Sequence, residues 1–98
     1  MEFREINIYI GNDSKLKTEL VEELTLLYEG TTTIPTEGTW EASETVYREK
    51  GYLIQVVTSE PLEDVYKAID RMHKSVNSNE IAIMVTSKPI DYNMRLYR

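Results

Sequence analysis

The sequence contains no cysteine, a single histidine and only four glycines among its 98 residues. Without cysteine there is no disulfide framework, no thiolate nucleophile and no zinc site of the cysteine–histidine type. The glycines are scattered, so the chain has neither a P-loop nor the dinucleotide-binding motif G-x-G-x-x-G. These absences exclude many catalytic and cofactor chemistries, and we expect no cofactor and no metal site.

Long apolar stretches are also missing. No run approaches the roughly 18 residues of a membrane helix, and the first residues do not resemble a signal peptide. The 17 acidic residues outnumber the 11 lysines and arginines, which gives a formal net charge of −6. Such a surface repels a phosphate backbone. We therefore expect a cytoplasmic protein that binds neither nucleic acid nor membranes directly.

What the sequence does contain is a regular succession of strand and helix patterns. Ile6, Ile8 and Ile10 alternate with polar residues, as in a half-buried strand. Apolar residues at helical spacing predict amphipathic helices over 14–29 and 61–76. Further strands are predicted around 31–34, 39–42, 52–57 and 81–85.

The order β-α-β-β-α-β predicts one α+β domain over residues 1–98 with a ferredoxin-like fold, in which split βαβ units place two helices on one face of an antiparallel sheet. The polar segment 43–50 is expected to be a long hairpin loop or its fraying arms. Alternation over 90–97 predicts an extra C-terminal strand. Because the other sheet face would be uncovered, we expect a homo-oligomer in which this last segment takes part.

One group of residues in the predicted hairpin region is a candidate ligand site. It combines hydroxyls, the sole tryptophan and a guanidinium, which together can hold a polar small molecule by stacking and hydrogen bonds. Arg48 is the expected anchor for an anion, because its planar fork pairs a phosphate or carboxylate bidentately. The candidate ligand-binding residues are Thr31, Thr33, Trp40, Tyr47, Arg48 and Glu49. The plainer alternatives are that Trp40 fills a core or an interface and that the threonines reflect β-propensity.

Candidate catalytic residues are few. His73 lies near the end of the second predicted helix, where a protonated histidine favours the helix dipole. A role for His73 or Glu49 as a general acid or base stays open as an alternative. No nucleophile elbow is visible. We therefore assign no catalytic residue.

Four short motifs occur in order along the chain: Asn7-Ile8-Tyr9-Ile10-Gly11, Gly30-Thr31-Thr32, Gly38-x-Trp40 and Glu49. Together they resemble a group of small uncharacterised proteins of phages and bacterial mobile elements, over roughly residues 5–85. The resemblance implies a phage-type accessory protein that acts in the host cytoplasm, countering host defence by binding.

Three functions follow as hypotheses. The favoured one is a non-catalytic binding protein for a small anionic, nucleotide-like ligand or for a host protein. The second is a small enzyme that uses Glu49 or His73 as acid or base. The third is a structural or interaction module, such as an acidic mimic that occupies a nucleic-acid site.

Overall fold

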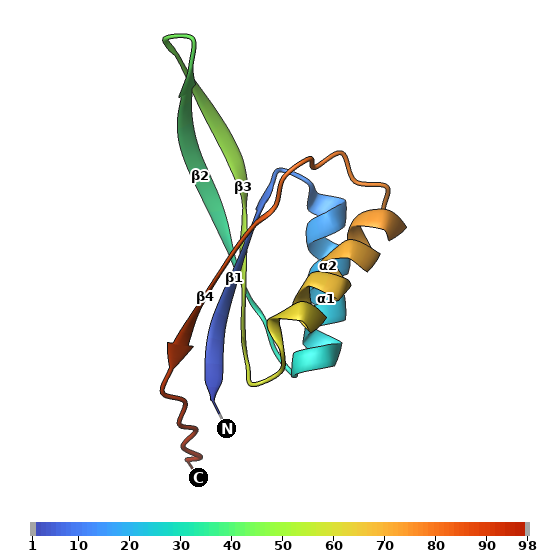
Figure 1. The fold of residues 1–98 in the computed structure, drawn as a ribbon, viewed down its shortest axis with the longest axis vertical. Coiled ribbons are helices and arrows are strands. Elements are labelled where there is room, and N and C mark those ends of the chain that lie inside the picture. Colours follow the sequence, from blue (N-terminus) through green and yellow to red (C-terminus); the bar gives the residue numbers. More distant parts are fainter. Residues whose placement is uncertain (1, 98) are drawn as a thin grey trace.

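The computed structural model describes residues 2–97, which form four strands and two helices (Figure 1). In chain order these are β1 (Phe3–Gly11), α1 (Ser14–Tyr28), β2 (Thr32–Ala42), β3 (Thr45–Thr58), α2 (Leu62–Ser75) and β4 (Met84–Ile90). None of the described helices combines the length and apolar character needed to cross a membrane.

The four strands form one antiparallel sheet in the order β2-β3-β1-β4. β1 and β3 are central, with Ile8 opposite Ile54, while β2 and β4 lie at the edges. Both helices lie on the same side of the sheet (Figure 1). This arrangement confirms the predicted ferredoxin-like α+β fold.

The core lies between the sheet and the helices. The alternating isoleucines of β1 point into it, and Ile6 and Ile8 are fully buried. α1 contributes Leu16, Leu20 and Leu24, all with no exposed surface. Because these positions repeat at the period of their element, the same alternation that predicts the strand and the helix also fixes which face is buried.

Helix α1 begins and ends close to the predicted positions. The Asp13 carboxylate accepts a hydrogen bond from the Leu16 amide at 2.9 Å and caps the helix. At the other end, Glu29 is the C-cap residue and adopts the left-handed conformation, with φ 70°. Helix α2 spans 62–75, within one residue of the prediction at each end.

Of the two alternatives for segment 43–50, the long loop is wrong, because the segment consists of a tight turn and a paired arm of the hairpin. β2 and β3 continue to a tight turn at Ser43 and Glu44, both with positive φ (52° and 64°). Two left-handed residues in a two-residue connection match the twist of an antiparallel pair. The alternating pattern is missing here because this end of the hairpin projects beyond the helices, so neither of its faces is buried (Figure 1).

The predicted positions of the C-terminal strands, around 81–85 and over 90–97, were also wrong. β4 occupies Met84–Ile90, whereas 81–83 and 91–97 have no regular structure, and Ile81 is fully exposed. The extra strand over 90–97 is therefore absent. The register gives the reason: Ile90 pairs with Phe3, the first residue of β1, so the chain beyond it has no strand to pair with.

Candidate functional site

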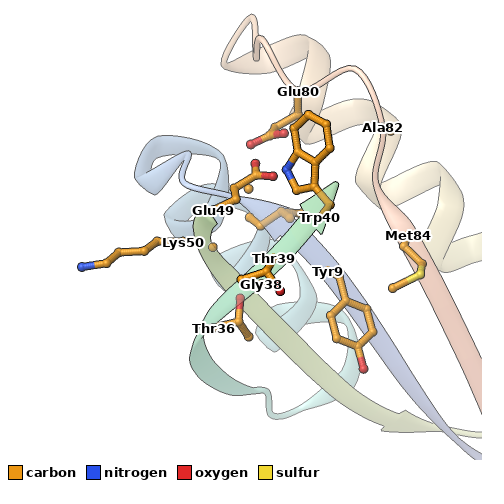
Figure 2. Close-up of a pocket in the computed structure, with 13 residues that line it drawn as sticks. Tyr9, Thr36, Gly38, Thr39, Trp40, Glu49, Lys50, Glu80, Ala82 and Met84 are labelled. Carbon is orange, nitrogen blue, oxygen red and sulfur yellow. The ribbon is translucent and has the colours of Figure 1, made fainter. Parts of the chain in front are cut away.

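The sheet face opposite the helices is open, and it carries a groove of about 350 Å³ where the β2–β3 hairpin leaves the sheet. The residues that line it come from β1, the hairpin and the segment 80–84 before and at the start of β4. Figure 2 shows Trp40, Glu49 and Glu80 gathered at one end, and Tyr9 and Met84 at the other. This groove brings together segments that are far apart in the sequence.

Two glycines that face each other across β1 and β3 make room for the groove. A Cβ atom at Gly51 would collide with the carbonyl oxygen of Ile10, so this glycine permits the close approach of the two strands. A Cβ atom at its partner Gly11 would collide with the carboxylate of Glu80 and lie 2.9 Å from Oε1 of Glu49. The two carboxylates thus converge on the space that a side chain at position 11 would fill.

A chain of hydrogen bonds holds Glu80 in this position. Ser78 donates its hydroxyl to Oδ2 of Asp13 at 2.7 Å and accepts the backbone amide of Glu80 at 3.1 Å. Nε2 of His73 donates to the carbonyl oxygen of Glu80 at 2.7 Å. The start of α1 and the end of α2 therefore jointly fix the backbone of Glu80. In this structure the His73 side chain stabilises the loop that contains Glu80.

The carboxylates of this region differ in their electrostatic environment. Burial raises the pKa of Glu80, and the nearby charges of Glu49 and Asp13 raise it further. The pKa of Asp13 is lowered by its hydrogen bonds from the Leu16 amide and the Ser78 hydroxyl. The groove thus contains one carboxylate, that of Glu80, whose charged form is disfavoured by its surroundings.

Neither Glu49 nor Glu80 forms an ion pair with a lysine or arginine within residues 2–97. The ion pairs of that part of the chain are Arg48–Glu37, Arg71–Glu23 and Lys88–Glu5. Lys50 borders the groove, but its side chain extends away from the carboxylates (Figure 2). Within residues 2–97, neither carboxylate at this end of the groove is therefore directly paired with a lysine or arginine.

The aromatic wall of the groove is a cross-strand pair. Trp40 lies opposite Tyr47, and their rings stack with centroids 4.5 Å apart and planes inclined by 19°. Trp40 is 51% exposed, and its indole lies beside the carboxylates of Glu49 and Glu80 (Figure 2). Such an arrangement offers a ring face and two acceptor groups to a molecule in the groove.

The structure separates the six candidate residues predicted from the sequence. Trp40, Tyr47 and Glu49 share the open face of the hairpin, at or beside the groove. Arg48 alternates onto the other face, where Nη1 lies 3.8 Å from Oε1 of Glu37.

The two candidate threonines lie at the opposite end of β2. The Oγ1 atom of Thr31 is 3.0 Å from that of Thr25, a hydrogen bond to α1. Thr33 pairs with Ile54, on the face that the helices cover, and is itself exposed. Neither threonine lines the groove.

Sequence reasoning missed Tyr9, Gly11, Glu80 and Met84. The glycine after an alternating strand was visible as a break, but nothing local marks it as the floor of a groove. Glu80 has no pattern around it either, because its position depends on contacts with residues 13 and 73. The groove depends on contacts between distant segments of the chain, and local sequence patterns do not reveal such contacts.

No protein-family model matches the sequence, and no curated protein matches it. Solved structures do resemble it. CutA1 from Oryza sativa superimposes with a TM-score of 0.68 at 14% identity, covering 96% of this chain and 84% of that one. The GlnK–ATP complex of B. subtilis gives 0.62 at 17% identity, covering 89% and 82%. A putative PII-like signaling protein from Thermus thermophilus gives 0.57 at 20% identity, covering 92% and 88%.

At these identities the similarity establishes the fold. The resemblance to phage and mobile-element proteins was wrong, because the solved structures that match include CutA and PII-like proteins instead. The motifs that suggested it are short glycine and threonine patterns at the ends of strands. Such patterns follow from the geometry of the fold and are not specific to one family.

Proposed function

We propose that the protein is a non-catalytic binding protein that holds a small molecule in the open-face groove. The observation that carries this proposal is the groove itself, a concave site with an aromatic wall, a glycine floor and a few convergent polar groups. Ligand sites in proteins have this composition. Trp40, Tyr47 and Glu49 are the residues of the original hairpin set that belong to this site.

The names of the fold neighbours support binding as the general role. One is called a divalent cation tolerance protein, one is a complex with ATP, and one is a putative signaling protein. Their low identity leaves the ligand of this chain to be argued from its own residues.

We further propose that the chain forms a homo-oligomer through the open sheet face. Neither helix covers this face, and it exposes apolar side chains on both edge strands, including Ile34 at 45% and Met84 at 58%. Apolar surface gathered on one face of a small domain favours association. The groove would then lie at or near a boundary between copies.

The oligomer is tested by light scattering on the full chain. We expect a mass above that of the monomer for the wild type, and a shift toward the monomer for Ile34→Lys. The matched control is Val46→Lys, which alters an exposed side chain on the other face of the hairpin and leaves the mass unchanged. A monomeric wild type at micromolar concentration would refute this part of the proposal.

A second candidate is a nucleotide-like anionic ligand bound on the other face of the hairpin. It is favoured by two cations, because Arg48 and Lys50 alternate along β3 with Glu49 and so share the other face, with Lys50 at the border of the groove. An anion at this place requires Arg48, whereas the groove does not. Arg48→Ala should therefore abolish binding of ATP in this case, and should leave binding in the groove nearly unchanged.

The groove is tested with the fluorescence of Trp40, the only tryptophan of the chain. A panel of nucleotides, divalent metals and organic amines and guanidines is titrated into the full chain. Gly38→Leu places a side chain in the groove, at a position where no atom lies within 4 Å of an added Cβ. It should abolish the response. Gly30→Leu, equally unhindered and outside the groove, should keep it. A panel with no response at all would contradict the proposal.

A further inference from the structure

The groove combines two features that could act on the same ligand. One is the pair of carboxylates, Glu49 and Glu80, that converge above Gly11. The other is the exposed ring face of Trp40, backed by its stack on Tyr47. Figure 2 shows the indole and both carboxylates facing the same space.

The charge of the groove decides the class of ligand. Two carboxylates without a cationic partner in the described chain repel an anion and attract a cation. The aromatic wall adds to this preference, since the face of an indole attracts ammonium and guanidinium groups. A nucleotide in this groove would place its phosphates against Glu49 and Glu80, which is unfavourable.

A bare metal ion fits less well than an organic cation. Within residues 2–97 no cluster of three or more histidine, aspartate or glutamate side chains is arranged to hold a metal. The groove of about 350 Å³ is also far larger than an ion requires, and Tyr9 and Met84 extend its wall away from the carboxylates. An elongated molecule with one charged end uses all of these surfaces.

We infer that the groove binds a small organic cation with a guanidinium or ammonium group, with the cationic end between Glu49, Glu80 and the face of Trp40. The aliphatic part lies along Tyr9 and Met84. A guanidinium suits this site best, because it both pairs with carboxylates bidentately and stacks on aromatic rings. This inference rests on the proposed function and specifies the ligand of the same groove.

Agmatine, which carries a guanidinium at one end and an ammonium at the other, is the first probe. Its titration into the full chain should change the fluorescence of Trp40 saturably. Glu49→Gln should weaken its affinity at least tenfold, because it removes one of the two charges that attract the cation. Glu49 is exposed on its strand and glutamine has the same shape, so the fold should not change. Glu37→Gln is the matched control on the opposite face of the hairpin and should change affinity less than twofold. Circular dichroism verifies that both variants are folded.

The outcomes distinguish failure of the inferred ligand class, an organic cation, from failure of the proposed function, small-molecule binding in the groove. If Zn²⁺ or ATP saturates the Trp40 signal and agmatine does not, the groove binds a ligand of another class, and only the inference fails. The inference also fails if agmatine binds wild type and Glu49→Gln equally. If none of the three probes and no member of the wider panel changes the signal, the proposed function fails with it.

Discussion

The two faces of the sheet are built from the same strands but are chemically opposite. On the helix side, Ile8, Ile54 and Val56 have at most 1% of their surface exposed. On the open side, Gln55 donates from Nε2 to Oε1 of Glu5 and Oδ1 of Asn7, both at 3.0 Å. One residue step along a strand moves a side chain from the core to this exposed surface, which carries polar side chains on the central strands and apolar side chains such as Ile34 and Met84 on the edge strands. The fold therefore depends on one face and leaves the other available for binding.

Truncation on the two faces should show this difference most strongly. Ile54→Ala removes a side chain with no exposed surface, and should lower the free energy of unfolding by about 2–5 kcal/mol. Ile34→Ala on the open face removes a side chain that is 45% exposed, and should cost about 1 kcal/mol or less. Urea unfolding of both variants at low protein concentration measures the two costs. Equal costs would show that the open face is as buried as the core.

The paired glycines lie opposite each other on the open face and compare a backbone clash with a side-chain clash at a single point of the sheet. Gly51→Ala forces a Cβ atom against the backbone oxygen of Ile10, which cannot move easily, and should cost about 1–3 kcal/mol. Gly11→Ala pushes against the ends of flexible side chains and should cost less. Urea unfolding gives both values, and the Trp40 titration with agmatine adds a second readout. Gly11→Ala should weaken that binding, because it displaces Glu80. The reverse order of the two stabilities would contradict this description of the strand crossing.

The smallest expected effect concerns the charge of the groove. The raised pKa of Glu80 means that the folded state binds this proton more tightly than the unfolded state. The stability that proton binding by Glu80 contributes is complete below the ordinary pKa of 4.5, and it is lost as the pH rises through the raised pKa of the folded state. Charged Glu80 therefore lowers stability at neutral pH, and Glu80→Gln should raise the melting temperature slightly there.

Thermal melts from about pH 4 to pH 7 measure this difference, which should shrink toward the acid end as Glu80 becomes protonated. Glu37→Gln is again the control on the opposite face. A variant Glu80→Gln that melts lower than the wild type at neutral pH would show that the carboxylate stabilises the fold, contrary to its place beside Glu49.

Much of the architecture was predictable because it is encoded by short-range periodicity. The spacing of Leu16, Leu20 and Leu24 predicts both a helix and its buried face. The alternation of Ile6, Ile8 and Ile10 does the same for β1. The order of such segments then leaves the ferredoxin-like fold as the expected way to bury all the apolar stripes together.

The hairpin and the C-terminal region show where that reasoning ends. The projecting part of β3, residues 45–50, has no buried face, so no hydrophobic pattern marks it as strand. Residues 90–97 do alternate, yet they form no strand beyond Ile90 because β1 provides no further partner. A strand needs a neighbour to complete its hydrogen bonds, and the neighbour is a property of the whole fold.

The sequence by itself determined the helices, the central strands and the residue types available for binding, because each of these depends on residues close together in the chain. Only the tertiary structure decided which of those residues form a site. It placed Glu80 next to Glu49 and Trp40, and turned Arg48 to the other face of the hairpin. The physical reason is that a binding groove is made of contacts between distant segments, and strand pairing and loop hydrogen bonds fix such contacts only when the chain is folded.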